Sequence, residues 1–118
     1  MNPAFRYRRL GYVALNVTNL AASRRFYGEL LGLQEAGTTA SGDVAFRCSS
    51  RHHDVLLREA PVAGLRRVGW QMESAGDLAT LRAHLAGPLG LAVHDVPAAE
   101  CVSLGLGAAF RVTEPNTG

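Results

Sequence analysis

Two segments of the chain alternate apolar and other residues in the same way. Residues 10–17 line up with residues 65–72 at a constant shift of 55 positions. The apolar positions are Val13, Leu15 and Val17 in the first segment and Val68, Trp70 and Met72 in the second. A period of two is typical of a half-buried strand. Each segment is therefore predicted to be a strand whose apolar face is covered by a helix.

A helical pattern follows each strand. In the first half, Thr18-Asn19 offers an N-cap, and one helix face carries Leu20, Ser23, Phe26, Tyr27, Leu30 and Leu31 before Gly32. This spacing predicts core packing for Phe26 and Tyr27. In the second half, Ser74 or Asp77 can cap a helix that carries Leu78, Leu81 and Leu85 and ends at Gly87-Pro88.

Short β-prone runs separated by turn residues follow each helix. They cover residues 33–39, 44–48 and 53–59 in the first half, and 91–96 and 108–113 in the second. Gly105-Leu-Gly107 is interpreted as a loop or bulge between strands. The predicted fold is α+β, with two βαβββ modules at 8–60 and 65–118 that together form one domain. The second module lacks its last strand, so we expect either a further strand after Gly118 or another partner at that sheet edge.

Composition and charge narrow the function classes. The 118 residues suit one globular domain, and no apolar run approaches the roughly 20 residues of a membrane span. No pattern of a signal peptide follows Met1, so a cytoplasmic location is expected. The net charge is +2 and the arginines are scattered, which argues against nucleic acid as a partner. Cys48 and Cys101 stand apart, so each is expected to be a buried, reduced thiol.

The opening of the chain resembles a known superfamily. The string Gly11-Tyr-Val-Ala-Leu-Asn-Val-Thr-Asn-Leu20, followed by Ser23, Phe26-Tyr27 and Leu30-Leu-Gly-Leu33, resembles the vicinal oxygen chelate superfamily. That superfamily includes glyoxalase I, bleomycin-resistance proteins and extradiol dioxygenases. The segments 52–59 and 110–118, with Gly64-Leu65, most resemble the amino-terminal domain of two-domain extradiol ring-cleaving dioxygenases.

The resemblance implies a function and a cofactor. In such two-domain proteins the amino-terminal domain has lost its metal, and the carboxy-terminal domain holds iron(II) with two histidines and a glutamate. The chain is thus expected to be the metal-free amino-terminal domain of a dioxygenase-like protein of catechol-type aromatic catabolism, with no cofactor of its own. Its expected partner is a carboxy-terminal catalytic domain or a second copy in a homodimer.

Strand alternation places a second set of residues on the face away from the helices. This face carries Tyr12, Ala14 and Asn16 on the first strand and Arg67, Gly69 and Gln71 on its repeat. The resemblance puts metal ligands at the positions of Tyr12, Leu56 and Arg67, and none of these is a good ligand. No catalytic residue or metal ligand is predicted. The candidates that line a cleft are Tyr12, Asn16, Leu56, Arg67 and Gln71, and Tyr12 with Arg67 can hold an anionic aromatic ligand.

The histidines offer no acid/base pair. His52 and His53 point to opposite faces if their segment is extended, so a solvated strand end is predicted for them. His84 is expected on a helix flank, and His94 diverges from its neighbour Asp95 on a strand. Two alternatives stay open: a stand-alone, dimeric small-molecule binding protein of the bleomycin-resistance type, and an active metal-dependent dioxygenase or glyoxalase that uses His53 or His94.

Overall fold

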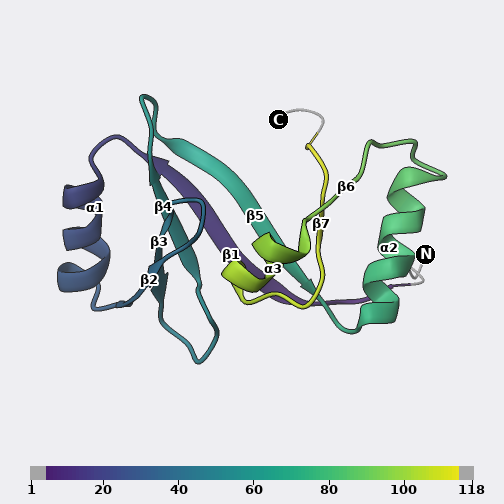
Figure 1. The fold of residues 1–118 in the computed structure, drawn as a ribbon, viewed down its shortest axis with the longest axis horizontal. Coiled ribbons are helices and arrows are strands. Elements are labelled where there is room, and N and C mark those ends of the chain that lie inside the picture. The colour runs from purple at the N-terminus through teal and green to yellow at the C-terminus, as the bar shows by residue number, and fades with distance from the viewer. Residues whose placement is uncertain (1–4, 115–118) are drawn as a thin grey trace. The chain divides into compact units, whose positions relative to one another are not determined.

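The computed structural model describes residues 5–114, and their contacts divide into two compact units. One unit is Leu10–Trp70 and the other consists of residues 5–9 and 71–114. Strands β1 (Tyr7–Val17) and β5 (Gly64–Met72) run through both units. Figure 1 shows the elements in chain order. No helix in the described part of the chain is long and apolar enough to cross a bilayer.

The unit 10–70 is built on a mixed sheet with the strand order β2-β3-β4-β1-β5. Its other strands are β2 (Gln34–Thr38), β3 (Val44–Arg47) and β4 (Val55–Glu59). Strand β4 runs parallel to β1, with Val13 opposite Val55 and Val17 opposite Glu59, whereas the β2-β3 and β3-β4 pairs are antiparallel. The predicted order of one strand, one helix and three strands is therefore confirmed for the first half.

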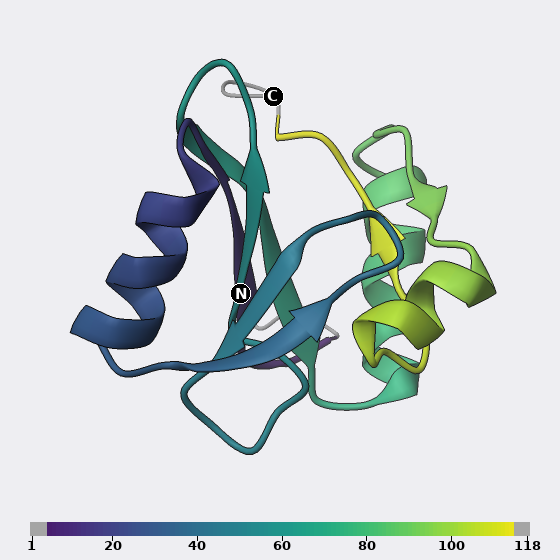
Figure 2. The same ribbon diagram turned by 60° about the vertical axis from the view of Figure 1, so that its left-hand side comes forward.

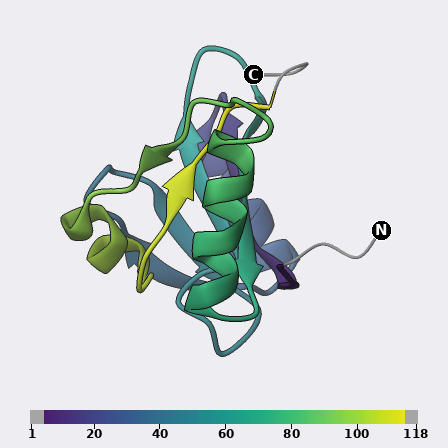
Figure 3. The same ribbon diagram turned by 90° about the vertical axis from the view of Figure 1, so that its right-hand side faces the viewer.

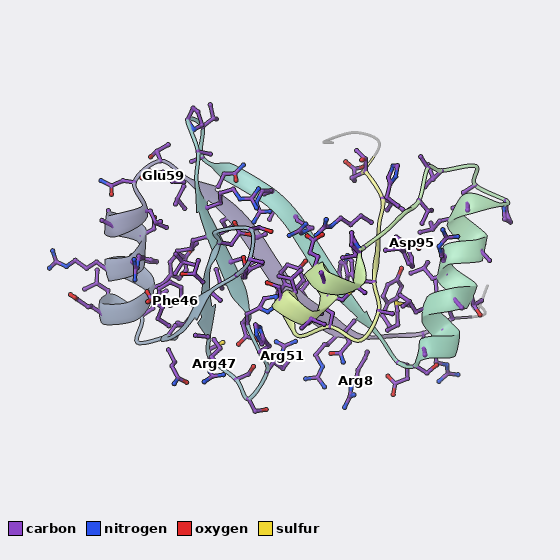
Figure 4. All side chains as sticks on the ribbon, in the orientation of Figure 1. Arg8, Phe46, Arg47, Arg51, Glu59 and Asp95 are labelled. Carbon is purple, nitrogen blue, oxygen red and sulfur yellow. The ribbon has the colours of Figure 1, made fainter. Side chains whose placement is uncertain are left out.

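The core of this unit lies between the sheet and its helix, as Figure 2 shows. Val44, Phe46 and Leu57 form its centre, and Leu15, Val17, Leu20, Tyr27, Leu33 and Val55 pack around them. Figure 4 labels Phe46, whose ring centroid is 6.0 Å from that of Tyr27. Leu15 and Val17 thus lie on the face of the sheet that packs against the helix, as the alternation on β1 predicts.

The first helix begins as predicted but ends differently. Asn19 Oδ1 accepts a hydrogen bond of 3.0 Å from the N–H of Ala22, which caps α1 (Leu20–Arg25). The helix then widens into the π-helical turn η1 (Phe26–Leu30). A π turn takes more residues than an α turn, so the spacing of 3.6 no longer holds. For this reason Tyr27 enters the core while Phe26 and Leu31 are exposed and Leu30 is 68% exposed, and the single apolar face predicted there was wrong.

The unit formed by residues 5–9 and 71–114 contains two helices and a short two-stranded sheet, shown in Figure 3. Ser74 Oγ caps α2 (Ala75–Ala86) by accepting from the N–H of Asp77, and Leu81 is buried. Strands β6 (His94–Asp95) and β7 (Phe110–Arg111) pair in antiparallel fashion and are much shorter than predicted.

Helix α3 (Ala98–Leu104) was not predicted. It buries Cys101 and Leu104 and ends at Gly105, whose φ of 69° lies in the left-handed region that suits a C-cap. Gly105-Leu-Gly107 is therefore a loop and not a bulge, and it joins a helix to a strand where two flanking strands were predicted. Cys101 is thus buried as predicted, whereas Cys48 is exposed and the burial predicted for it was wrong.

Strand β5 is the last strand of the five-stranded sheet. Within residues 5–114, β1 is its neighbour on one edge and no strand pairs with the other edge. Leu65 is 64% exposed and Trp70 is 62% exposed, so the half-burial predicted for Trp70 is not observed. An edge position removes one of the neighbours that would cover such a side chain.

Candidate functional site

Asp54 organises the loop between β3 and β4. This nearly buried carboxylate accepts hydrogen bonds from Cys48 N at 2.8 Å, Ser49 Oγ at 2.9 Å and Arg51 Nη2 at 2.6 Å. Arg51, labelled in Figure 4, also donates from Nη1 to the carbonyl oxygen of Leu10 and so links the loop to β1. Burial acts to raise the pKa of Asp54, but these hydrogen bonds and the Arg51 charge hold it below its usual range.

This loop brings His52 and His53 together. Their Nδ1 atoms are 3.0 Å apart, and His53 is 4% exposed. The prediction that they diverge at a solvated strand end was wrong for His53, because β4 begins only at Val55 and both histidines lie in the bent loop. Burial, followed by the nearby His52 charge, lowers the pKa of His53 to about 4. Its Nε2 is buried without a hydrogen-bond partner.

Tyr12 contacts both this loop and β5. Its ring centroid is 4.6 Å from that of His53, and Arg67 Cζ lies 5.9 Å from the same Tyr12 centroid, within cation–π range. A Cβ on Gly69 would come within 2.2 Å of Tyr12 Cε1, so the ring occupies the space that a larger residue would fill. Tyr12 and Arg67 are therefore brought together, as the alternation predicted.

A second polar group lies in the same unit and was not predicted. Asp43 is 1% exposed and binds two arginines, with Arg58 Nε 2.7 Å from Oδ1 and Arg66 Nη2 2.9 Å from Oδ2. Burial lowers the pKa of Arg66 although Asp43 opposes that change. No local pattern in the sequence points to this group, because the arginines stand 15 and 23 residues from Asp43. We call Asp43, Arg58, Arg66 and Arg67 the basic cluster.

The other cleft candidates lie in different environments. Asn16 is opposite Arg58 in the β1-β4 register, and its Oδ1 is buried without a partner. Leu56 is fully buried and opposite both Ala14 and Ala45. Gln71 is exposed and belongs to the unit formed by residues 5–9 and 71–114.

The donor set does not fit an iron(II) site. A phenol, an alkyl group and a guanidinium occupy Tyr12, Leu56 and Arg67, and a guanidinium stays protonated and repels a cation. In residues 5–114 no three His, Cys, Asp or Glu side chains are grouped so that they could hold a metal ion. Asp95 hydrogen-bonds Arg82 at 2.8 Å, so that carboxylate is engaged by a cation.

Comparison with known proteins places these features in a family. Residues 9–100 match the Glyoxalase/Bleomycin resistance protein/Dioxygenase superfamily. The chain is 39% identical over 74 residues to biphenyl-2,3-diol 1,2-dioxygenase of Paraburkholderia xenovorans (strain LB400), an alignment that covers 63% of this chain and 24% of that protein. The chain thus spans about a quarter of the curated relatives it matches.

Solved structures give the same result. The 2,3-dioxygenase LapB from Pseudomonas sp. KL28 superposes with a TM-score of 0.83 at 32% identity, over 92% of this chain and 38% of LapB. A variant of homoprotocatechuate 2,3-dioxygenase from B.fuscum superposes with a TM-score of 0.76 at 28% identity, over 96% of this chain and 31% of that enzyme. The chain belongs to the Glyoxalase/Bleomycin resistance protein/Dioxygenase superfamily, and its homologues are extradiol dioxygenases.

Proposed function

We propose that the chain is the metal-free amino-terminal domain of a two-domain extradiol ring-cleaving dioxygenase-like protein of aromatic catabolism. The observation that carries this proposal is the Arg67 guanidinium beside the Tyr12 ring, at positions where the family resemblance would require ligands. A fixed positive charge there opposes a bound cation. Iron(II) then belongs to a carboxy-terminal catalytic domain of the same protein, in the cytoplasm.

The lengths of the relatives support the two-domain arrangement. The chain covers 24% of the biphenyl-2,3-diol dioxygenase and 31 to 38% of the two solved dioxygenases, so most of each of those proteins lies outside the matched region. We assign residues 8–60 and 65–118 as the two modules of one domain. Strand β1 is flanked by β4 and β5, whereas its repeat β5 is flanked by β1 alone in the described residues. A parallel strand from the same polypeptide, equivalent to β4, would complete that edge.

In this proposal the chain supports the catalytic domain structurally and supplies no catalytic residue. Its buried carboxylates, Asp43 and Asp54, are engaged by arginines, and His53 is held neutral by burial near neutral pH. None of these groups is placed as a free acid or base. The rigid sheet can instead position a catalytic domain or a second copy.

The test compares the 118-residue chain with the longest protein that its gene encodes. We expect the longer protein to bind iron(II) in about equimolar amount and to cleave biphenyl-2,3-diol or another catechol. The 118-residue chain, purified without a tag, should bind far less than one iron per chain and show no ring cleavage. Stoichiometric iron in the 118-residue chain would reject the proposal, and so would a gene that ends at Gly118 or just after one further strand.

One observation favours a second candidate, a dimeric small-molecule binding protein. The basic cluster holds three arginines and one carboxylate, an excess of positive charge that suits an anionic ligand. A gene that encodes only this domain, together with saturable binding of an aromatic acid, would favour this candidate over the first.

A further inference from the structure

Arg67 differs from the other arginines of the basic cluster. Arg58 and Arg66 both bind Asp43, whereas Arg67 forms no ion pair within residues 5–114 and contacts the ring of Tyr12. Its Nε is buried and has no hydrogen-bond partner. A partly buried cation without an anionic partner costs free energy that a bound anion would recover.

The electrostatic surroundings of Arg67 are positive. Burial lowers the pKa of Arg66 most, Asp43 opposes this change, and the charges of Arg58 and Arg67 then add to the lowering. The charge of Arg67 also acts on His53, whose pKa burial lowers first. Because Asp43 is shared by two other guanidiniums, the cluster keeps an excess of positive charge. Such a site favours an anion over a neutral molecule or a cation.

Further unpaired polar atoms belong to neighbouring residues of this unit. The buried side-chain atoms without a hydrogen-bond partner in residues 5–114 are Asn16 Oδ1, His53 Nε2, Arg66 Nε and Arg67 Nε. His53 is 4% exposed, and the Tyr12 ring contacts both His53 and Arg67. Native proteins leave few buried polar atoms unpaired, so the unpaired atoms of His53 and Arg67, which both contact the Tyr12 ring, favour a polar ligand there.

We propose that this face of the sheet binds a carboxylate at Arg67. The guanidinium pairs with the two carboxylate oxygens, and Tyr12 favours a carboxylate carried by an aromatic ring. The carboxylate can come from a small aromatic acid or from an aspartate or glutamate elsewhere in the same polypeptide. The site is for binding alone, and it does not depend on whether a catalytic domain accompanies the chain.

Titration of the 118-residue chain with benzoate tests the proposal. Binding is followed by calorimetry and by the side-chain Nε–Hε resonances of arginine in ¹⁵N NMR spectra. The Arg67 resonance should shift saturably, and Arg67→Gln should weaken binding by about 10-fold or more, because a charge-assisted pair is lost. Arg25→Gln is the matched control: Arg25 is exposed and paired with Glu29, so this variant should bind benzoate like the parent chain.

Two further ligands test whether the carboxylate charge or the aromatic ring of benzoate accounts for binding. Cyclohexanecarboxylate should bind more weakly than benzoate, and benzyl alcohol should not bind; equal binding of benzyl alcohol and benzoate would overturn the proposal. Unchanged affinity in Arg67→Gln, or no shift of the Arg67 resonance in the parent chain, would overturn it too. If Arg67→Gln does not fold, the test depends on whether benzoate shifts the Arg67 resonance of the parent chain.

The longer protein distinguishes the two sources of carboxylate. If an aspartate or glutamate from another segment fills the site, benzoate should bind the 118-residue chain and not the longer protein. If the ligand is a small acid, both should bind benzoate. Either result supports the proposal, and absence of binding to the 118-residue chain rejects it, whatever the iron content of the longer protein.

Discussion

Tyr12 and Gly69 pack so closely that each fixes the size of the other. A Cβ added to Gly69 would lie 2.2 Å from Cε1 and 2.4 Å from Cδ1 of the Tyr12 ring. Glycine in a strand interior is unfavourable in itself, and an aromatic ring laid across it recovers packing between the two strands. The close contact therefore explains why a glycine stands in the middle of β5.

Substitution of this glycine should destabilise the fold. Gly69→Ala forces the Tyr12 ring to move, at a cost of about 1 to 3 kcal/mol in the free energy of unfolding. Urea denaturation followed by circular dichroism would measure it. Gly64→Ala is the control, because Gly64 is also on β5 and a Cβ there meets nothing within 4 Å. If Gly69→Ala unfolds at the same urea concentration as Gly64→Ala, the packing argument fails.

Asp43 gives the second prediction. Asp43→Asn leaves Arg58 and Arg66 without their shared carboxylate in a buried position, which should cost about 3 to 5 kcal/mol of stability. The exposed pair of Arg82 and Asp95 provides the comparison, since solvent screens that pair and Asp95→Asn should change the stability much less. Chemical denaturation of both variants checks the difference. Equal losses would mean that burial of the Asp43 group contributes little.

The order of the main elements could be predicted because their signals are local. Alternation on β1, the Asn19 cap and the turn residues between β2 and β3 each act over a few neighbouring positions. Helix α3 was missed because its seven residues include only two buried positions, too few to set a period. The π turn was missed because no residue type marks it in the sequence.

The site was predicted only in part for a related reason. Tyr12 and Arg67 could be paired through the 55-residue repeat, which relates β1 to β5. The contacts of Asp43 depend on how loops and strands distant in sequence approach each other, and no repeat relates them. His53 was misjudged because its role depends on a bend of the chain before Val55 and not on strand alternation.

One edge of β5 has no neighbouring strand among residues 5–114, and this gives a third prediction. In the 118-residue chain, the amides of β5 that point away from β1 should exchange with solvent on the order of 10-fold faster or more than the amides of β1, which has neighbours on both sides. Hydrogen exchange observed by NMR measures this ratio. In the longer protein the same amides should become protected. Equal protection of β1 and β5 in the 118-residue chain would show that its β5 edge is already paired.

The buried histidine gives a prediction for pH. The pKa of His53 is about 4 in the folded chain against 6.5 when unperturbed, so the unfolded state binds more protons between these values. His53 therefore makes its full contribution to the free energy of unfolding above pH 6.5. As the pH falls towards 4, about 2 to 3 kcal/mol of that free energy is lost. The groups that act on His53 are His52, Asp54, Arg51 and Arg67.

Substitution of His53 isolates its contribution to the pH dependence of stability. His53→Gln should be less stable than the parent at pH 7 but should lose less stability between pH 6.5 and 4. His94→Gln, at an exposed position, should keep the parent slope. Urea unfolding at several pH values measures both slopes. If the parent and His53→Gln lose stability in parallel as the pH falls, then the burial of neutral His53 is not what links folding to protons in this range, and the loss must come from other groups.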